Sequence, residues 1–133
     1  MKLKTISLPK FGDDRGALVV LEVGKEIPFE IKRVYYMFDT QLGIRRGFHA
    51  HKELIQVAIP VKGSCKFLMD DGYEKVEILL DNPNIGLVIE PMIWHEMYDY
   101  SDDCVLMVLA SDHYDEIDYI RNYQDFEREV KNG

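Results

Sequence analysis

Two histidines separated by one residue are the clearest candidates for chemistry in this sequence. His49 and His51 stand in the segment 46–51, which reads RGFHAH. Side chains alternate across a β-strand, so both imidazoles are predicted on one face, with Phe48 and Ala50 on the other. Because the pKa of histidine lies near neutral pH, such a pair is suited to moving protons, and its ring nitrogens also suit a divalent metal ion.

The spacing around these histidines resembles the first motif of the cupins, G-x5-H-x-H-x(3,4)-E-x6-G, and the segment 91–95 resembles part of the second, P-x-G-x-x-H. Gln56 takes the place of the acidic ligand, six residues before Gly63, and a neutral amide is a weak ligand for a hard divalent ion. Met92 stands where the second motif has glycine. The resemblance implies a cupin pocket lined by His95, and the two departures from the motifs argue against a metal ion there.

The residues around the two histidines are predicted to form short β-strands. Gly, Asp, Asn and Pro separate runs that are rich in β-branched and aromatic residues, at a fairly even spacing that is typical of a β-sandwich or barrel. The fold class is therefore all-β, a cupin jelly-roll barrel with one C-terminal α-helix, in a single domain of residues 1–133. The expected strands are residues 17–23, 31–38, 48–59, 64–69, 73–80, 86–90, 94–100 and 105–110.

The C-terminal segment has a different period. Its apolar residues recur at steps of three and four, which predicts one amphipathic helix packed on the outside of the β-domain. Asp115 and Glu116 would lie near the positive end of the helix dipole. The apolar residues of this predicted helix are Ile117, Ile120, Tyr123, Phe126 and Val130.

Composition narrows the classes of function. The formal net charge of -8 disfavours binding to nucleic acid, whose phosphates it repels. Residues 1–9 alternate polar and apolar types rather than forming the apolar core of a signal peptide, and no apolar run reaches membrane-spanning length. Cys65 and Cys104 are expected to be reduced thiols on strands, which indicates a cytoplasmic protein.

A more specific resemblance extends over nearly the whole chain. The segments DDRGAL, IKRVYYMFDT, RRGFHAHKELIQ, GSCKFLMDDG and PMIWHEMYDYSDDCVLMVLASDHYDEIDYIRNY are similar to those of the dTDP-4-oxo-6-deoxyglucose 3,4-ketoisomerases. This family consists of metal-independent cupins that make precursors of 3-amino-3,6-dideoxy sugars. DDRG and RGFH are also similar, more distantly, to the dTDP-sugar 3,5-epimerases.

The resemblance implies a reaction and roles for three residues. A ketone moves from C4 to C3 of the hexose through an enediol, without a redox cofactor because the electrons stay within the sugar. His49 is expected to remove the proton from C3, and His51 to serve as the proton shuttle or to hold the enediolate. Tyr35 is expected to donate a hydrogen bond from its phenol, whereas Tyr36 points the other way and is predicted to be core.

The nucleotide diphosphate needs cationic partners. Bidentate arginine suits phosphate oxygens, and Arg15, Arg33 and Arg46 are the candidates within recognised segments. Gly16 would let backbone approach a ligand closely. In the resembling family, Arg-Gly at this position accompanies the galacto product, which favours 3-oxo-6-deoxygalactose. A homodimer is expected because related cupins dimerise through strand exchange.

Arg45, next to Arg46, is a weaker candidate for binding the phosphates. Arg121 and Arg128 are expected to form surface ion pairs on the predicted helix. Three other functions stay open at this point. They are a metal-dependent cupin (a phosphosugar isomerase or a dioxygenase), a dTDP-sugar 3,5-epimerase, and a module that binds a nucleotide sugar without turnover.

Overall fold

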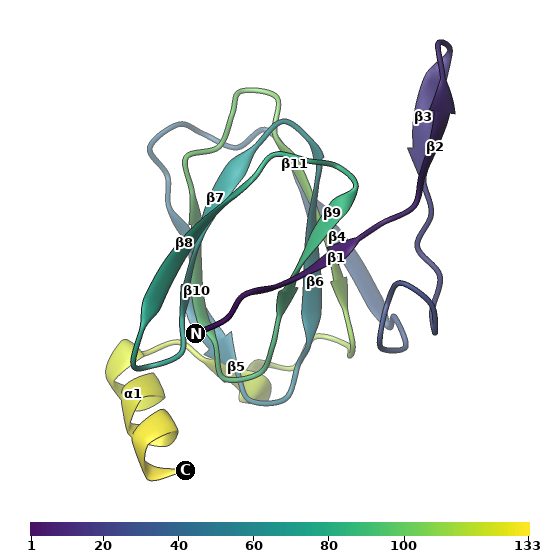
Figure 1. The fold of residues 1–133 in the computed structure, drawn as a ribbon. Coiled ribbons are helices and arrows are strands. Elements are labelled where there is room, and N and C mark those ends of the chain that lie inside the picture. The colour runs from purple at the N-terminus through teal and green to yellow at the C-terminus, as the bar shows by residue number, and fades with distance from the viewer.

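The chain folds into two five-stranded antiparallel sheets that face one another (Figure 1), in a computed structural model that describes all 133 residues. A separate two-stranded hairpin and one helix complete it. The first sheet has the order β1 (Lys4–Ser7), β9 (Ile85–Ile89), β6 (Gln56–Lys62), β11 (Val105–Ala110) and β4 (Arg33–Met37). The second has the order β12 (Tyr119–Ile120), β5 (Arg46–His51), β10 (Trp94–Tyr98), β7 (Cys65–Asp70) and β8 (Lys75–Leu80).

The main core fills the space between these two sheets. Residues of β6, β7, β9 and β11 meet there because the inward-facing positions of each strand are apolar. The predicted jelly roll with one C-terminal helix is confirmed, although no strand pairing closes the two sheets into a continuous barrel. The fully buried members of this core include Ala58, Cys65, Phe67, Leu87 and Leu106.

The predicted strand over residues 48–59 is wrong in one respect, because the structure divides it into β5 and β6. Residues 52–55 carry the chain from the second sheet to the first, and a continuous strand cannot belong to both. The backbone N–H groups of Glu53 and Leu54, which lose their ladder partners there, donate instead to the carboxylate of Asp118.

The C-terminal helix is shorter than predicted. It begins at Tyr123 and spans Tyr123–Asn132 (α1), with Asn122 as its N-cap. The residues before it form a 3-10 turn (Glu116–Asp118) and then β12, which pairs with β5. Ile117, expected on the apolar face, is 82% exposed. Phe126 meets the prediction, because it is fully buried against Ala50, Trp94 and Ile120 on the outer side of β5.

The hairpin of β2 (Lys10–Asp13) and β3 (Gly16–Val19) projects from the sheets (Figure 1). Its strands pair only with one another. Nearby, β4 forms the edge of the first sheet and leaves the outward face of the strand uncovered. Tyr36 lies on that face and is 63% exposed, so its prediction as a core residue is wrong. Tyr36 does point away from Tyr35, as the alternation of side chains along a strand predicts, but no element of the same chain covers this face of β4.

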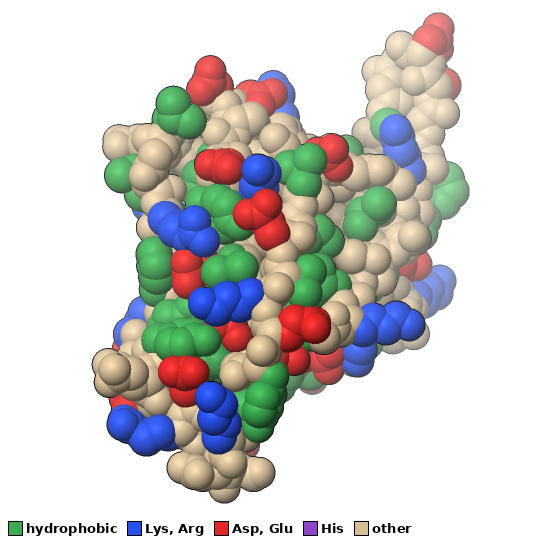
Figure 2. Space-filling view, turned by 60° about the vertical axis from the view of Figure 1, so that its left-hand side comes forward, with side chains coloured by type: hydrophobic (Ala, Val, Ile, Leu, Met, Phe, Trp, Pro, Cys, Tyr) green, Lys and Arg blue, Asp and Glu red, His purple; other side chains and the backbone are tan.

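Charged side chains of both signs are interspersed over the face seen in Figure 2, and no histidine appears on it. No helix of the structure is long and apolar enough to cross a membrane. Cys65 and Cys104 are both buried and are not bridged to one another.

Candidate active site

Three histidines come together where β5 and β10 pair. His49 is directly opposite His95 in the register of the two strands. The ring centroid of His49 lies 5.1 Å from that of His51 and 4.6 Å from that of His95. The prediction that His49 and His51 share a face is therefore confirmed, and His95, expected to line the pocket, lies beside them on the neighbouring strand.

A bulge in β5 sets the direction of His49. The register shifts by one residue between β5 and β10, so that Gly47 pairs with Glu96 while His49 pairs with His95. Gly47 and Phe48 both have positive φ angles, of 94° and 60°. A Cβ on Gly47 would lie 2.7 Å from the carbonyl oxygen of His95, so glycine is required there. The strained conformation of Phe48 lies directly before the candidate base, as is common at active sites.

All three imidazoles are held in the neutral form. Burial lowers the pKa of His95 to about 3 and that of His51 to about 4, and burial also lowers the pKa of His49. His51 and His95 are each only 2% exposed. A neutral ring has one nitrogen that can accept a proton, so at neutral pH each ring is a candidate general base.

The hydrogen-bond partners of His49 and His95 select the tautomer. Nδ1 of His49 lies 3.0 Å from the carbonyl oxygen of Gly47, and Nδ1 of His95 lies 3.2 Å from that of Ile93. A carbonyl only accepts, so each Nδ1 carries the proton and each Nε2 keeps a free lone pair. These two rings are thus prepared to accept a proton at Nε2.

Tyr35 is held by a residue whose role sequence reasoning missed. Gln56, which takes the cupin acidic-ligand position, is buried and donates from Nε2 to the hydroxyl oxygen of Tyr35 at 3.1 Å. The phenol accepts this bond, so its own O–H remains free to donate to a ligand. Burial is the main cause that raises the pKa of Tyr35, which keeps the hydroxyl protonated. The signal available in the sequence was the amide at a position where the motif has an acid.

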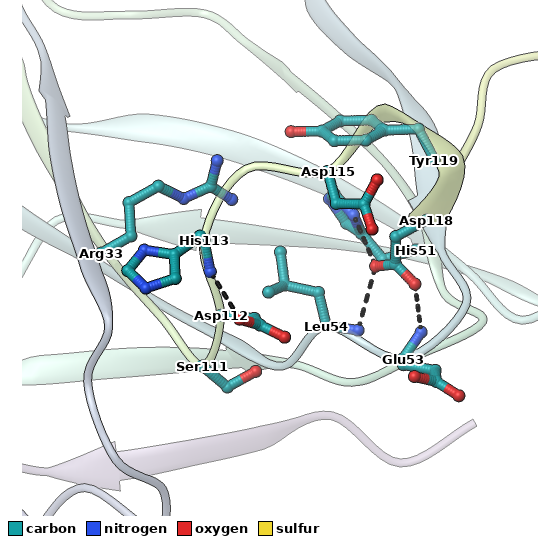
Figure 3. Close-up of a pocket in the computed structure, with 10 residues that line it drawn as sticks. All are labelled: Arg33, His51, Glu53, Leu54, Ser111, Asp112, His113, Asp115, Asp118 and Tyr119. Carbon is teal, nitrogen blue, oxygen red and sulfur yellow. Dashed lines mark hydrogen bonds and ion pairs between the residues drawn. The ribbon is translucent and has the colours of Figure 1, made fainter.

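Two cavities border the histidines. One, of about 330 Å³, is bounded by β4 and β5 and by Tyr119 and Arg121, and it lies on the His49 side. The other, of about 210 Å³, lies on the His51 side (Figure 3). Arg33 and Tyr119 line both of them, so the histidines stand between two adjoining hollows.

Two arginines reach the first cavity without an acidic partner. Arg33 on β4 and Arg46 on β5 both line it, and neither forms an ion pair with a carboxylate of the chain. The Nε atom of Arg33 is buried without a hydrogen-bond partner. Such groups are available for an anion, even though the chain as a whole is acidic.

Arg121 is a further residue that the sequence did not place in the site. It forms the predicted ion pair, with Glu116 at 2.6 Å, but it lies before α1 rather than on it. It also lines the first cavity, with its guanidinium 4.3 Å from the ring centroid of Tyr119. Arg45 pairs with Glu96. The short strand β12 brings this segment beside β5, which the helical period of the sequence did not reveal.

The structure does not bring Arg15 and Gly16 to the histidines of the same chain. Both lie at the turn of the projecting hairpin (Figure 1), where the guanidinium of Arg15 bonds to the carboxylate of Asp13. Their part in binding stays a prediction.

The histidine cluster also meets one requirement of a metal site. One ring nitrogen of each of His49, His51 and His95 lies within 4.8 Å of the others, which a transition-metal ion can span. No carboxylate joins the cluster, however, and the amide of Gln56 is engaged with Tyr35. The cluster therefore offers three imidazole nitrogens without a carboxylate, a set of groups that also suits proton transfer by the rings.

Comparison with known proteins shows the family to which the chain belongs. The FdtA family model, described as WxcM-like, C-terminal, matches residues 1–131. A TDP-4-oxo-6-deoxy-alpha-D-glucose-3,4-oxoisomerase of Aneurinibacillus thermoaerophilus is 55% identical over 130 residues, which cover 98% of this chain and 94% of the relative. The chain belongs to the sugar 3,4-ketoisomerase family. The resemblance drawn from its sequence segments is confirmed.

Solved structures of sugar 3,4-ketoisomerases have the same fold. A 3,4-ketoisomerase from Helicobacter canadensis is 49% identical, with a TM-score of 0.94 and coverage of 98% of both chains. A mutant of the 3,4-ketoisomerase QdtA from Thermoanaerobacterium thermosaccharolyticum, in complex with TDP-4-keto-6-deoxyglucose, is 43% identical. Its TM-score is 0.96, and the match covers 98% of this chain and 94% of that one.

Proposed function

We propose that this sugar 3,4-ketoisomerase moves the keto group of dTDP-4-oxo-6-deoxy-D-glucose from C4 to C3. The observation that carries the proposal is the cluster of three neutral imidazoles beside a phenol whose O–H is free to donate. This set provides a base, a proton carrier and a hydrogen-bond donor, which are the groups that an enediol pathway needs.

The proton steps can be assigned to named atoms. Nε2 of His49 accepts the proton of C3, which is acidic because the carbonyl is adjacent, and the electron pair of the broken C–H bond forms the C3–C4 double bond. Tyr35 donates a hydrogen bond to the negative oxygen that develops. The hydroxyl proton moves from O3 to O4. His51, whose Nε2 has first taken up a proton from solvent, delivers that proton to C4 as the C3 ketone forms, and His49 releases the C3 proton to solvent. His95 borders the substrate. Protons and electrons balance without a redox cofactor.

The nucleotide end of the substrate carries two phosphate charges. Arg33 and Arg46 lack acidic partners at the first cavity, which supports their assignment to the diphosphate. Arg121 borders the same cavity and is a third candidate, although its pair with Glu116 already neutralises part of its charge.

The stereochemistry at C4 is a finer part of the proposal. The pair Arg15-Gly16, which accompanies the galacto product in the resembling family, supports dTDP-3-oxo-6-deoxy-D-galactose as the product, a precursor of 3-amino-3,6-dideoxy sugars of surface glycans. The unbridged thiols of Cys65 and Cys104 support a cytoplasmic setting, where a nucleotide sugar would be processed.

One experiment separates this reaction from its alternatives. The protein is incubated with dTDP-4-oxo-6-deoxyglucose in deuterated buffer, and the sugar is followed by NMR. A ketone at C3 with deuterium at C4 is expected, and the proton couplings of C4 identify the galacto product. Deuterium at C5 with the ketone still at C4 would indicate 3,5-epimerisation. An unchanged sugar that nevertheless binds would indicate a non-catalytic module.

We further propose that the chain acts as a homodimer in which the hairpin of one copy packs on the other. An isolated two-stranded hairpin is marginally stable at best, and this one pairs with no other strand of its own chain. Phe11 and Leu18 lie opposite one another on it and are more than half exposed. The outer face of the edge strand β4 exposes Val34 and Tyr36 as well, so two apolar surfaces lack a cover.

A dimer of this kind would place Arg15 in the partner's site, and complementation tests that placement. An Arg15→Gln chain and a His49→Asn chain are each inactive in this scheme. After mixing and exchange, about half of the dimers are mixed, and each has one site with an intact His49 and an intact Arg15. Recovery of roughly one quarter of wild-type activity is expected. No recovery, with mixed dimers demonstrated by mass, would contradict the exchange of Arg15.

A further inference from the structure

His51 differs from the other two histidines in what its Nδ1 faces. His49 and His95 each point Nδ1 at a neutral backbone carbonyl. Nδ1 of His51 instead lies 3.4 Å from Oδ2 of Asp118 (Figure 3). The ring is almost fully buried, and neither of its nitrogens has a hydrogen-bond partner at normal distance. An imidazole that is buried without partners has a role in the site beyond packing.

The carboxylate of Asp118 is held in place independently of the imidazole. Its Oδ1 accepts the backbone N–H of Glu53 at 2.9 Å, and its Oδ2 accepts that of Leu54 at 3.2 Å. The backbone carbonyl of Asp118 accepts the N–H of Lys52 at 2.9 Å. Three bonds thus fix the 3-10 turn against the end of β5, so the negative charge is already positioned before any proton moves.

From this geometry we propose that Asp118 is a positioning residue for His51, which it holds as the Nδ1–H tautomer and stabilises while the ring carries a proton to C4. The inference rests on the proposed isomerase function and deepens it. Of the three clustered rings, His51 is the one beside a carboxylate, which offsets part of the cost of a positive charge on this buried ring. His49, which faces a neutral carbonyl, is left as the base at C3.

The proton balance of this step is simple. Nε2 of His51 accepts a proton from solvent, and the imidazolium then has Nδ1–H directed at the carboxylate. The Nε2–H bond breaks as the C4–H bond forms, and the ring returns to its neutral Nδ1–H form. Asp118 stays ionised throughout and touches neither substrate nor reacting atom.

The test is Asp118→Asn, with Asp115→Asn as the matched control. Asparagine at 118 keeps an oxygen for the backbone N–H of Glu53. Its NH₂ group takes the place of Oδ2, so it gives up the bond from the N–H of Leu54, faces Nδ1 of His51 and favours the opposite tautomer. Asp115 caps the same 3-10 turn through the N–H of Ile117, and asparagine preserves that cap. Asp115 forms no ion pair with His51, whose carboxylate neighbour is Asp118. The control therefore reports the effect of removing one negative charge from the same turn, and the tautomer of His51 reports the effect of Asp118 on the ring itself.

Two readouts are measured on both variants and on the wild type. Nitrogen-15 NMR of histidine-labelled protein should show the Nδ1–H tautomer of His51 in the wild type and in Asp115→Asn, and the Nε2–H tautomer in Asp118→Asn. Turnover of the dTDP keto sugar should fall at least about 100-fold in kcat for Asp118→Asn, with KM within about threefold, which is the scale of a lost acid–base step. Asp115→Asn should keep kcat within about twofold.

The outcomes separate this inference from the proposed function. Wild-type kcat in a folded Asp118→Asn protein would overturn it, and so would an Nε2–H tautomer of His51 in the wild type, which needs no variant to fold. If the wild type does not isomerise the sugar, the proposed function fails, while the tautomer measurement still reports on the pairing of Asp118 with His51.

Discussion

Mild acid should destabilise this protein through its buried histidines. Burial lowers the pKa of His95 to about 3 and that of His51 to about 4, whereas the unfolded chain has the ordinary value of about 6.5. In the window between these values the unfolded state binds more protons than the folded state. Stability is therefore fully present above about pH 6.5 and is lost as the pH falls toward about 4.

The magnitude follows from the same values. Between about pH 7 and about pH 5, each of the two rings should cost roughly 2 kcal/mol of unfolding free energy, or about 4 kcal/mol together. That is a large share of the 5–15 kcal/mol, roughly, by which most domains are stable. Carboxylates such as Glu116, whose pKa the Arg121 guanidinium and the Tyr114 hydroxyl hold at about 2, contribute little in this interval.

Urea unfolding at the two pH values measures the effect, with His95→Gln as the matched variant. The loss in the wild type should be about 4 kcal/mol, and about half of it should disappear in His95→Gln, whatever the stability of that variant at neutral pH. Equal wild-type stability at both pH values, or an unchanged loss in the variant, would refute the account of these rings as neutral groups held away from water.

Three further predictions concern the site. Tyr35→Phe should lower kcat by about 100- to 1,000-fold with little change in KM, the scale of one lost oxyanion donor; steady-state kinetics check this, and a purely KM effect would contradict it. Arg46→Gln should raise KM by about 10- to 100-fold with kcat within a few-fold, since a charge-assisted hydrogen bond to a phosphate is lost, and titration with dTDP should show the same loss of affinity; unchanged binding would remove Arg46 from the diphosphate site. Treatment with a chelator, followed by metal analysis, should leave activity within about twofold, whereas activity that is lost and then restored by one divalent ion would favour a metal-dependent cupin built on the three histidines.

Much of the fold was predictable because the strands of a jelly roll are short and carry strong local signals. The alternation in RGFHAH placed His49 and His51 on one face, and the structure agrees. The break between β5 and β6 was not predictable, since residues 52–55 carry no glycine or proline and the chain turns there to change sheets. A side chain 64 residues further along the chain, Asp118, supports that turn.

The remaining parts of the site depend on contacts that sequence patterns do not encode. The helical period ran through Ile117 and Ile120, but the pairing of β12 with β5 outweighed it and brought Arg121 to the cavity. Alternation alone assigned Tyr36 to a core, although nothing in one chain covers the outer face of an edge strand. Long-range pairing and uncovered surface are properties of the assembled fold.

The central claim is that imidazoles in this cleft move protons between neighbouring carbons of the sugar, with His49 as the base at C3. The most direct measurement compares wild type and His49→Asn for dTDP binding by calorimetry and for conversion of the dTDP keto sugar under single-turnover conditions. The account predicts that the variant binds dTDP within about threefold of wild type and converts the sugar at least about 1,000-fold more slowly, which lies within the usual range for loss of a general base. Conversion at the wild-type rate in the variant would contradict it.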